Sequence, residues 1–173
     1  TNSAMTQIRG TFSASDVDMY QINICDAANW SATTVGGSTI DTQLWLFKQD
    51  GTGVACDDDS AGGLQSTLSN IAVAPLGNGL YYLAISVFNR DAAGASTNGL
   101  IWNSNVQDAT PDGPAAAEPV GNWLNATNGT GPYAIALTGT THTQIAGATA
   151  VRSREFTQLD DFCRCLAIAL ERW

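Results

Sequence analysis

The chain of 173 residues carries 16 acidic and 7 basic side chains, which gives a formal net charge of −9 at pH 7. This charge argues against a nucleic-acid partner, because a phosphate backbone is bound by clustered Lys and Arg side chains. No apolar run approaches the ~20 residues that a membrane-spanning helix needs, so we expect no membrane span.

The acidic excess lies wholly in residues 1–150, which hold 12 acidic and three basic residues, whereas residues 151–173 hold four of each. Eleven of the 12 acids are Asp, a residue typical of turns, caps and metal-binding loops rather than of helices. We therefore expect residues 1–150 to form few helices and the last stretch to be built differently.

Alternation of apolar and polar side chains with a period of two predicts strands through most of the first 138 residues. Residues 6–13 are strand-like, and in residues 18–25 the side chains of Tyr20, Ile22 and Ile24 share one face. Residues 41–48 are apolar on both faces, which is typical of a central strand. The glycine-rich residues 49–53 predict a hairpin turn that returns the chain into a strand at residues 54–56.

Further strands are predicted at residues 68–74, 80–88, 100–103 and 133–138, with a long acidic surface loop rich in Pro and Ala at residues 108–119. The sequence therefore predicts an all-β chain with two antiparallel sheets packed face to face.

The C-terminal stretch changes to a helical period. Apolar residues recur at steps of three and four positions from residue 156 to residue 173, with charged residues between them, which predicts an amphipathic helix. We expect a β-sandwich over residues 1–139, a linker over residues 140–152 and this helix over residues 153–173. The apolar stripe of the helix must pack either on its own sandwich or on a neighbouring molecule, because a helix of this length is marginal alone in water.

The four cysteines are Cys25, Cys56, Cys163 and Cys165. Cys163 and Cys165 would point to opposite faces of a helix, which makes them poor partners for each other. A Cys25–Cys56 disulfide is the favoured bridge, and the alternative is that all four thiols are reduced and packed.

Catalytic signatures are scarce in this sequence. His142 is the only histidine, and it lies in the expected linker. Nucleophile, P-loop, dinucleotide-binding and zinc-protease motifs are all missing. We therefore expect a protein that is not an enzyme.

The run Asp57-Asp58-Asp59 is the strongest sign of chemistry, because adjacent carboxylates repel one another unless they are solvated or bridged by a cation. Ca²⁺ binds six to eight oxygens from such loops. The predicted hairpin returns this run to Asp41, and Asp16 and Asp18 lie at the entry of another strand. These six aspartates are the candidate calcium ligands, and the alternative is a solvated acidic loop.

Trp123 is the tryptophan most expected to be exposed, because it lies in the polar run Gly-Asn-Trp-Leu-Asn. An exposed indole ring can stack on a sugar, so Trp123 is the candidate ligand-binding residue. Trp45 alternates within an apolar strand and is expected in the core.

The order of several short motifs resembles that of bacterial pre-peptidase C-terminal (PPC)-like domains. The similarity covers residues 8–139 and rests on these stretches: Asp16 to Tyr20, Trp30 to Gly37, Asp41 to Phe47, Asp50-Gly51, Asp57 to Ser60, Gly79 to Ser86, Asn89-Arg90-Asp91, Pro111 to Pro114, and Tyr133 to Gly139. The resemblance implies a jelly-roll-like β-sandwich, an extracellular or cell-surface location and a non-catalytic role. Some members bind calcium, at positions that Asp16, Asp18 and residues 57–59 match, and some accompany hydrolases.

The expected function is therefore that of a non-catalytic extracellular structural or adhesive module. Self-association into a surface assembly or filament is a further expectation, through the N-terminal segment or the C-terminal helix. The alternative is a carbohydrate- or protein-binding accessory module of a secreted hydrolase, with a glycan or matrix partner.

Overall fold

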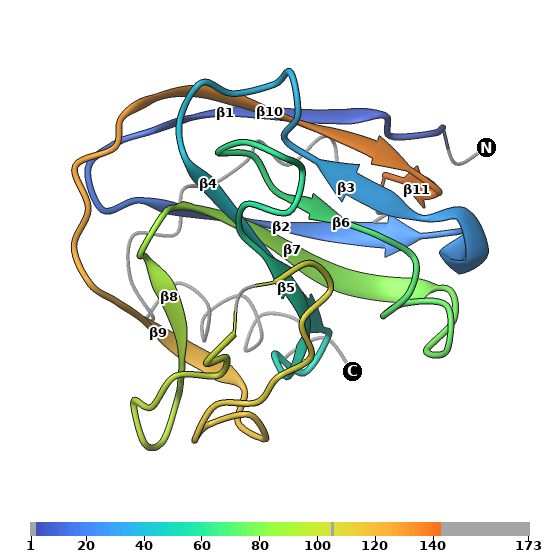
Figure 1. The fold of residues 1–173 in the computed structure, drawn as a ribbon. Coiled ribbons are helices and arrows are strands. Elements are labelled where there is room, and N and C mark those ends of the chain that lie inside the picture. The colour runs from blue at the N-terminus through green and yellow to red at the C-terminus, as the bar shows by residue number, and fades with distance from the viewer. Residues whose placement is uncertain (1–2, 105, 143–173) are drawn as a thin grey trace, which may run out of the picture.

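The computed structural model describes residues 3–104 and 106–142, and it confirms that this part of the chain is an all-β sandwich (Figure 1). The strands, in chain order, are β1 (Gln7–Phe12), β2 (Val17–Ile24), β3 (Ser31–Thr33), β4 (Thr42–Lys48), β5 (Gly53–Asp57), β6 (Thr67–Leu68), β7 (Gly79–Val87), β8 (Asp91–Gly94), β9 (Val120–Leu124), β10 (Gly131–Thr138) and β11 (Thr140–Thr141). One short 3₁₀ turn, η1 (Ala27–Asn29), lies between β2 and β3.

The strands form two main antiparallel sheets and one small one. The four-stranded sheet has the order β1-β10-β3-β6, and the five-stranded sheet has the order β11-β2-β7-β4-β5. Strands β8 and β9 form a separate two-stranded sheet, below the five-stranded sheet in the view of Figure 1. The molecule therefore has a third layer that the sequence did not predict.

Strand β4 lies inside the five-stranded sheet and is buried on both faces, as its apolar pattern predicts. Leu44 and Leu46 point into the core between the two main sheets. Trp45 and Phe47 point the other way, into a second core. Side chains of a strand alternate between its faces, so one apolar run contributes to both cores.

The second core is covered by β8, β9 and the chain between them. Ile101 and Trp102 are fully or almost fully buried there, and the Trp102 indole N–H donates a 2.8 Å hydrogen bond to the carbonyl of Ala109. Residues 100–103 were predicted to form a strand, and this prediction is wrong. Their apolar side chains fill the second core from a loop, and one isolated bridge joins Leu100 to Ala93.

The strand predicted at residues 68–74 is also wrong, because only Thr67–Leu68 pairs. The chain then turns at Asn70, whose carbonyl accepts hydrogen bonds from the N–H groups of Val73 and Ala74. Val73 is buried, but Ile71 is 72% exposed. The apolar residues of this stretch resemble a strand in sequence, yet the turn places them in different environments.

The two ends of the described chain meet at one edge of the five-stranded sheet. Thr140 and Thr141, expected to begin a linker, form β11 and pair with β2. Near the N-terminus, an isolated bridge joins Ala4 to Thr141. The strand expected at residues 6–13 is β1 (Gln7–Phe12), which pairs with β10 in the four-stranded sheet. The helix predicted at residues 153–173, with its two cysteines, lies outside the described residues. In residues 3–104 and 106–142 there is no helix long and apolar enough to cross a membrane.

The predicted Cys25–Cys56 disulfide is wrong, because both thiols are free. Cys25 follows the end of β2 and is exposed, whereas Cys56 lies in β5 and is buried. Two further strands separate β2 from β5 in the sheet. Three strand spacings amount to roughly 14 Å, about twice the Cα separation that a disulfide spans.

Strand β7 offers a test of the core between the two main sheets. Ile85 is fully buried there, and Ile85→Ala should lower the free energy of unfolding by about 2–5 kcal/mol, because the surrounding side chains cannot refill the cavity. Denaturant unfolding measures this change. Leu80, on the same strand but 38% exposed, is the matched control, and Leu80→Ala should cost about 1 kcal/mol or less. Equal costs would contradict this description of the core.

Candidate metal centre

Three aspartates meet where β4 begins and β5 ends. Asp41 directly precedes β4, and Asp58 and Asp59 directly follow β5. The two strands form an antiparallel hairpin in which Leu44 lies opposite Asp57, so the hairpin brings these positions together. One carboxylate oxygen from each of Asp41, Asp58 and Asp59 lies within 4.8 Å of the others. The sequence predicted this convergence of Asp41 with the acidic run.

Three hydrogen bonds hold the backbone at the start of β4, beside this cluster. The carbonyl of Asp41 accepts a 3.0 Å bond from the N–H of Phe88, at the end of β7. The N–H of Thr42 donates a 3.0 Å bond to the carbonyl of Leu64, and the Ser66 hydroxyl donates to the carbonyl of Thr42. The loop from β5 to β6 is thereby fastened to the start of β4.

Two carboxylate oxygens of the cluster lack such hydrogen bonds. Asp41 Oδ1 and Asp58 Oδ1 are buried from solvent, and neither has a hydrogen-bond partner among the described residues. Asp41 and Asp58 are half-buried and Asp59 is exposed. The cluster therefore holds unsatisfied acceptor oxygens beside an opening to solvent, an arrangement that costs free energy unless a cation or proton occupies it.

The electrostatics of the cluster favour neutralisation. Burial and the neighbouring charges of Asp59, Asp41 and Asp57 raise the pKa of Asp58 to about 7. Burial and the charge of Asp59 also raise the pKa of Asp41. A bound cation would reverse this effect, because an opposite charge stabilises the ionised form of a carboxyl group.

Asp57 was predicted as a ligand, but its side chain is turned toward the chain that follows. Its Oδ2 accepts 2.5 Å hydrogen bonds from the Ser60 hydroxyl and the Thr67 N–H. Its Oδ1 is buried without a hydrogen-bond partner in the described part of the chain, and burial raises its pKa. Asp57 thus fastens the acidic loop, and it lies next to the cluster of three without belonging to it.

Asp16 and Asp18 do not join the cluster. Asp16 closes a turn, where it accepts hydrogen bonds from the N–H groups of Ser13 and Val17 at 3.2 and 3.0 Å. Asp18 is 6% exposed and accepts a hydrogen bond from the Tyr133 hydroxyl. Asp18 and Asp57 lie in one row across the five-stranded sheet, with β7 and β4 between them, which places their backbones roughly 14 Å apart.

Asp91, at the start of β8, is a neighbouring acid that the sequence did not single out. Its charge adds to those that raise the pKa of Asp58. Its two oxygens accept hydrogen bonds from the side-chain amides of Gln43 and Asn125, at 3.3 and 3.2 Å. The motif Asn89-Arg90-Asp91 was visible in the sequence, but nothing local linked it to the acidic run.

Trp123, expected to be exposed, is half-buried on the second core. Its ring packs edge-on against Trp45 and Phe47, with centroid distances of 5.9 and 6.2 Å. Aromatic packing against these two core residues accounts for the position of Trp123.

The cluster has the chemistry of a hard-cation site. The three ligand atoms lie within 4.8 Å of one another, which is close enough for one cation to contact all three. Asp41, Asp58 and Asp59 would supply three carboxylate groups, and solvent at the exposed side could complete the shell.

The raised pKa of Asp58 predicts how stability depends on pH in the absence of metal. The unfolded chain loses this proton near pH 4, whereas the folded chain keeps it until about pH 7. The folded state therefore binds more protons in this interval, and its stability falls as the pH rises. Melting temperatures in EDTA should fall between about pH 5 and about pH 8, and Asp58→Asn should reduce the fall.

Asp50 provides the control, because hydrogen bonds from the hydroxyl and N–H of Thr52 lower its pKa. Asp50→Asn should leave the fall over the same interval in place. A flat profile in the unmodified chain would contradict the electrostatics described for the cluster.

Comparison with models of known protein families gives no match. Searches of curated proteins and of solved structures likewise find none that is similar.

Proposed function

We propose that this chain is a non-catalytic extracellular structural or adhesive β-sandwich module that is stabilised by calcium. The observation that carries the proposal is the cluster of Asp41, Asp58 and Asp59, whose buried oxygens lack hydrogen-bond partners among the described residues. A cation there would join the start of β4 to the loop that follows β5. Its role would be to hold the fold, since the ligands come from the two ends of one hairpin.

The hydrogen bonds of other acidic side chains support a structural role. Asp50, Asp108 and Glu118 each accept hydrogen bonds from backbone N–H groups of a turn or loop. Asp112 does the same for Asn103 and Ser104, at 2.7 and 3.3 Å. These carboxylates fasten long loops to the sandwich, which is the role expected of polar side chains in a rigid module.

The extracellular location rests on two supports. Extracellular modules bind Ca²⁺ with dissociation constants of about 10⁻⁴–10⁻³ M, which a partly open site with few ligands satisfies. The second support is the resemblance of residues 8–139 to PPC-like domains of secreted and surface proteins. Inside cells, where free Ca²⁺ is scarce, such a site would stay protonated or empty.

The alternative, a carbohydrate- or protein-binding accessory module, needs an exposed aromatic platform. The Trp123 ring packs against Trp45 and Phe47, so it offers little exposed aromatic surface for such a platform. Self-association by exchange of the N-terminal strand would require β1 to leave β10 and expose Phe12, which is 2% exposed in the sandwich. The structural module is therefore the function that we favour.

Calcium should raise the melting temperature of the chain. At about a hundredfold excess of Ca²⁺ over its dissociation constant, linkage adds about 2.7 kcal/mol. For a protein of this size, that corresponds to roughly 5–10 °C. Mg²⁺ should give a smaller shift, and EDTA should reverse the effect of Ca²⁺. Differential scanning calorimetry measures these changes.

Asp58→Asn and Asp41→Asn should each abolish most of the calcium-induced shift, because each removes a charged ligand from the cluster. Asp112→Asn is the matched control, since Asp112 caps a loop elsewhere in the fold, and its shift should match that of the unmodified chain. The proposal fails if calcium leaves the melting temperature unchanged, or if the shift survives in both cluster variants.

A further inference from the structure

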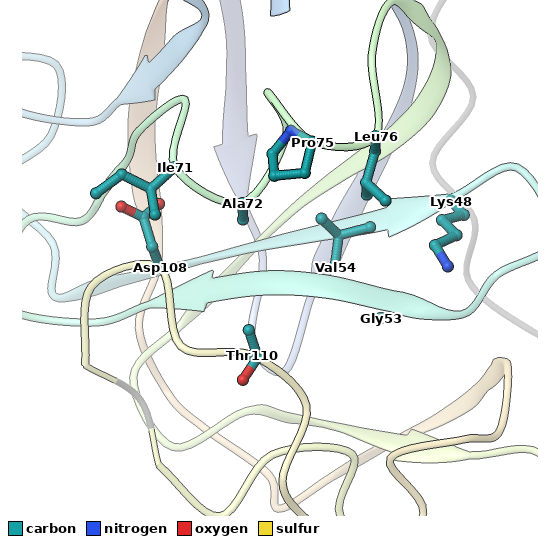
Figure 2. A pocket seen from close by; sticks show the side chains of 9 residues that line it. All are labelled: Lys48, Gly53, Val54, Ile71, Ala72, Pro75, Leu76, Asp108 and Thr110. Carbon is teal, nitrogen blue, oxygen red and sulfur yellow. The ribbon is translucent and has the colours of Figure 1, made fainter. Parts of the chain in front are cut away.

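An apolar groove of about 340 Å³ lies over strand β5 (Figure 2). One wall is the turn that follows β6, which contributes Ile71, Pro75 and Leu76, and the floor includes Val54. Thr110 lies across β5, and the Asp108 carboxylate lies beside Ile71, where it accepts hydrogen bonds from Ser69. The groove is thus apolar along one wall and polar at its rim.

The apolar wall of the groove is strongly exposed. Ile71 is 72% exposed and Leu76 is 48% exposed. Single exposed apolar side chains are ordinary, but two that line one groove mark a surface suited to another apolar group.

The sequence of this chain contains a segment with matching properties. In residues 153–173, apolar side chains recur at helical spacing, and Cys163 lies on this stripe whereas Cys165 does not. The apolar positions are Phe156, Leu159, Phe162/Cys163, Leu166, Leu170 and Trp173. The segment carries four acidic and three basic residues, so its net charge of −1 adds little repulsion from the acidic sandwich.

The described chain ends at a place from which this segment can reach the groove. Thr141 pairs with Asn23, and Asn23 pairs with Leu80 at the start of β7. The next residue of β7, Tyr81, pairs with Lys48, which lines the groove. The C-terminal segment therefore leaves from the end of the five-stranded sheet at which the groove opens.

The distance across the sheet is also within reach. Strands β11 and β5 are the two edges of the five-stranded sheet, four strand spacings or roughly 19 Å apart. Residues 143–152 can span up to about 33 Å when extended. A flexible chain of this length has a root-mean-square span of about 17–19 Å. A linker whose span matches the distance gives an effective concentration of about 1 mM or more, so binding within one chain prevails over binding between chains at lower protein concentrations.

We propose that residues 153–173 dock their apolar side chains in this groove of their own chain. The C-terminal segment then buries the exposed side chains of Ile71 and Leu76 within the same chain. This proposal is independent of calcium binding, because the groove and the cluster of Asp41, Asp58 and Asp59 share no residue.

Disulfide trapping in the full chain tests the proposal. The background carries Cys25→Ser, which removes the exposed thiol of the sandwich, and Cys165→Ser, which leaves Cys163 in the C-terminal segment. Cys56 is buried and burial raises its pKa, so it stays unreactive. Leu76→Cys in this background should form a disulfide with Cys163 within one chain under mild oxidation. Mass spectrometry of peptides from the monomer fraction measures the yield.

Phe88→Cys is the matched control for the groove position. Phe88 is 49% exposed, close to the value for Leu76, but it follows the opposite end of β7 from Tyr81. The yield with Leu76→Cys should exceed that with Phe88→Cys by about tenfold, because docking raises the local concentration of the thiol. Ile71→Cys, at a second groove position, should behave like Leu76→Cys.

The apolar stripe of residues 153–173 gives a second control. In a background that keeps Cys165 and carries Cys163→Ser, the yield with Leu76→Cys should drop, because residues 163 and 165 face opposite sides of a helix. Equal yields at positions 76 and 88, or no disulfide at either groove position, would overturn the proposal. Disulfides formed only between chains would also overturn it, since the groove would then be filled by a second copy.

Discussion

The architecture depends on one constraint, which is that strand β4 is apolar on both faces and must be buried on both. Its neighbours β7 and β5 complete a sheet that needs two covers, one for Leu44 and Leu46 and one for Trp45 and Phe47. The four-stranded sheet provides the first cover. The pair β8–β9 and the chain between them provide the second. The long connections after β8 are therefore part of the core rather than surface decoration.

The same hairpin that satisfies this constraint creates the candidate metal centre. Residues that precede β4 and follow β5 must meet, because the two strands pair antiparallel up to Asp57. Half of the twelve acids in the described residues accept hydrogen bonds from backbone N–H groups, and in this way they order loops. Asp41, Asp58 and Asp59 do not, and their repulsion is what a divalent cation would relieve. Within one acidic surface, neighbouring carboxylates thus divide into those that fasten the fold and those that could hold an ion.

Much of the fold could be predicted from the sequence, but the candidate site only in part. Period-two alternation located β2, β7 and β10, whereas the apolar run of β4 and the glycine-rich turn after it located β4 and β5. Alternation failed at residues 68–74 and 100–103, where apolar side chains serve the core from turns. The hairpin predicted that Asp41 meets the acidic run. It did not predict that Asp57 would turn away to cap Thr67, because that hydrogen bond depends on where a later strand returns.

The sequence by itself determined the all-β class, the central place of β4 and the approach of Asp41 to Asp58 and Asp59. Each of these follows from contacts between residues close in sequence, or from a pattern that one strand carries alone. The tertiary structure decided which acids remain unpaired, the separation of Cys25 from Cys56 and the place of Trp123 on the second core. These depend on strand order and on the path of long loops. Both bring together residues far apart in the chain, and the local sequence around each residue does not predict such contacts.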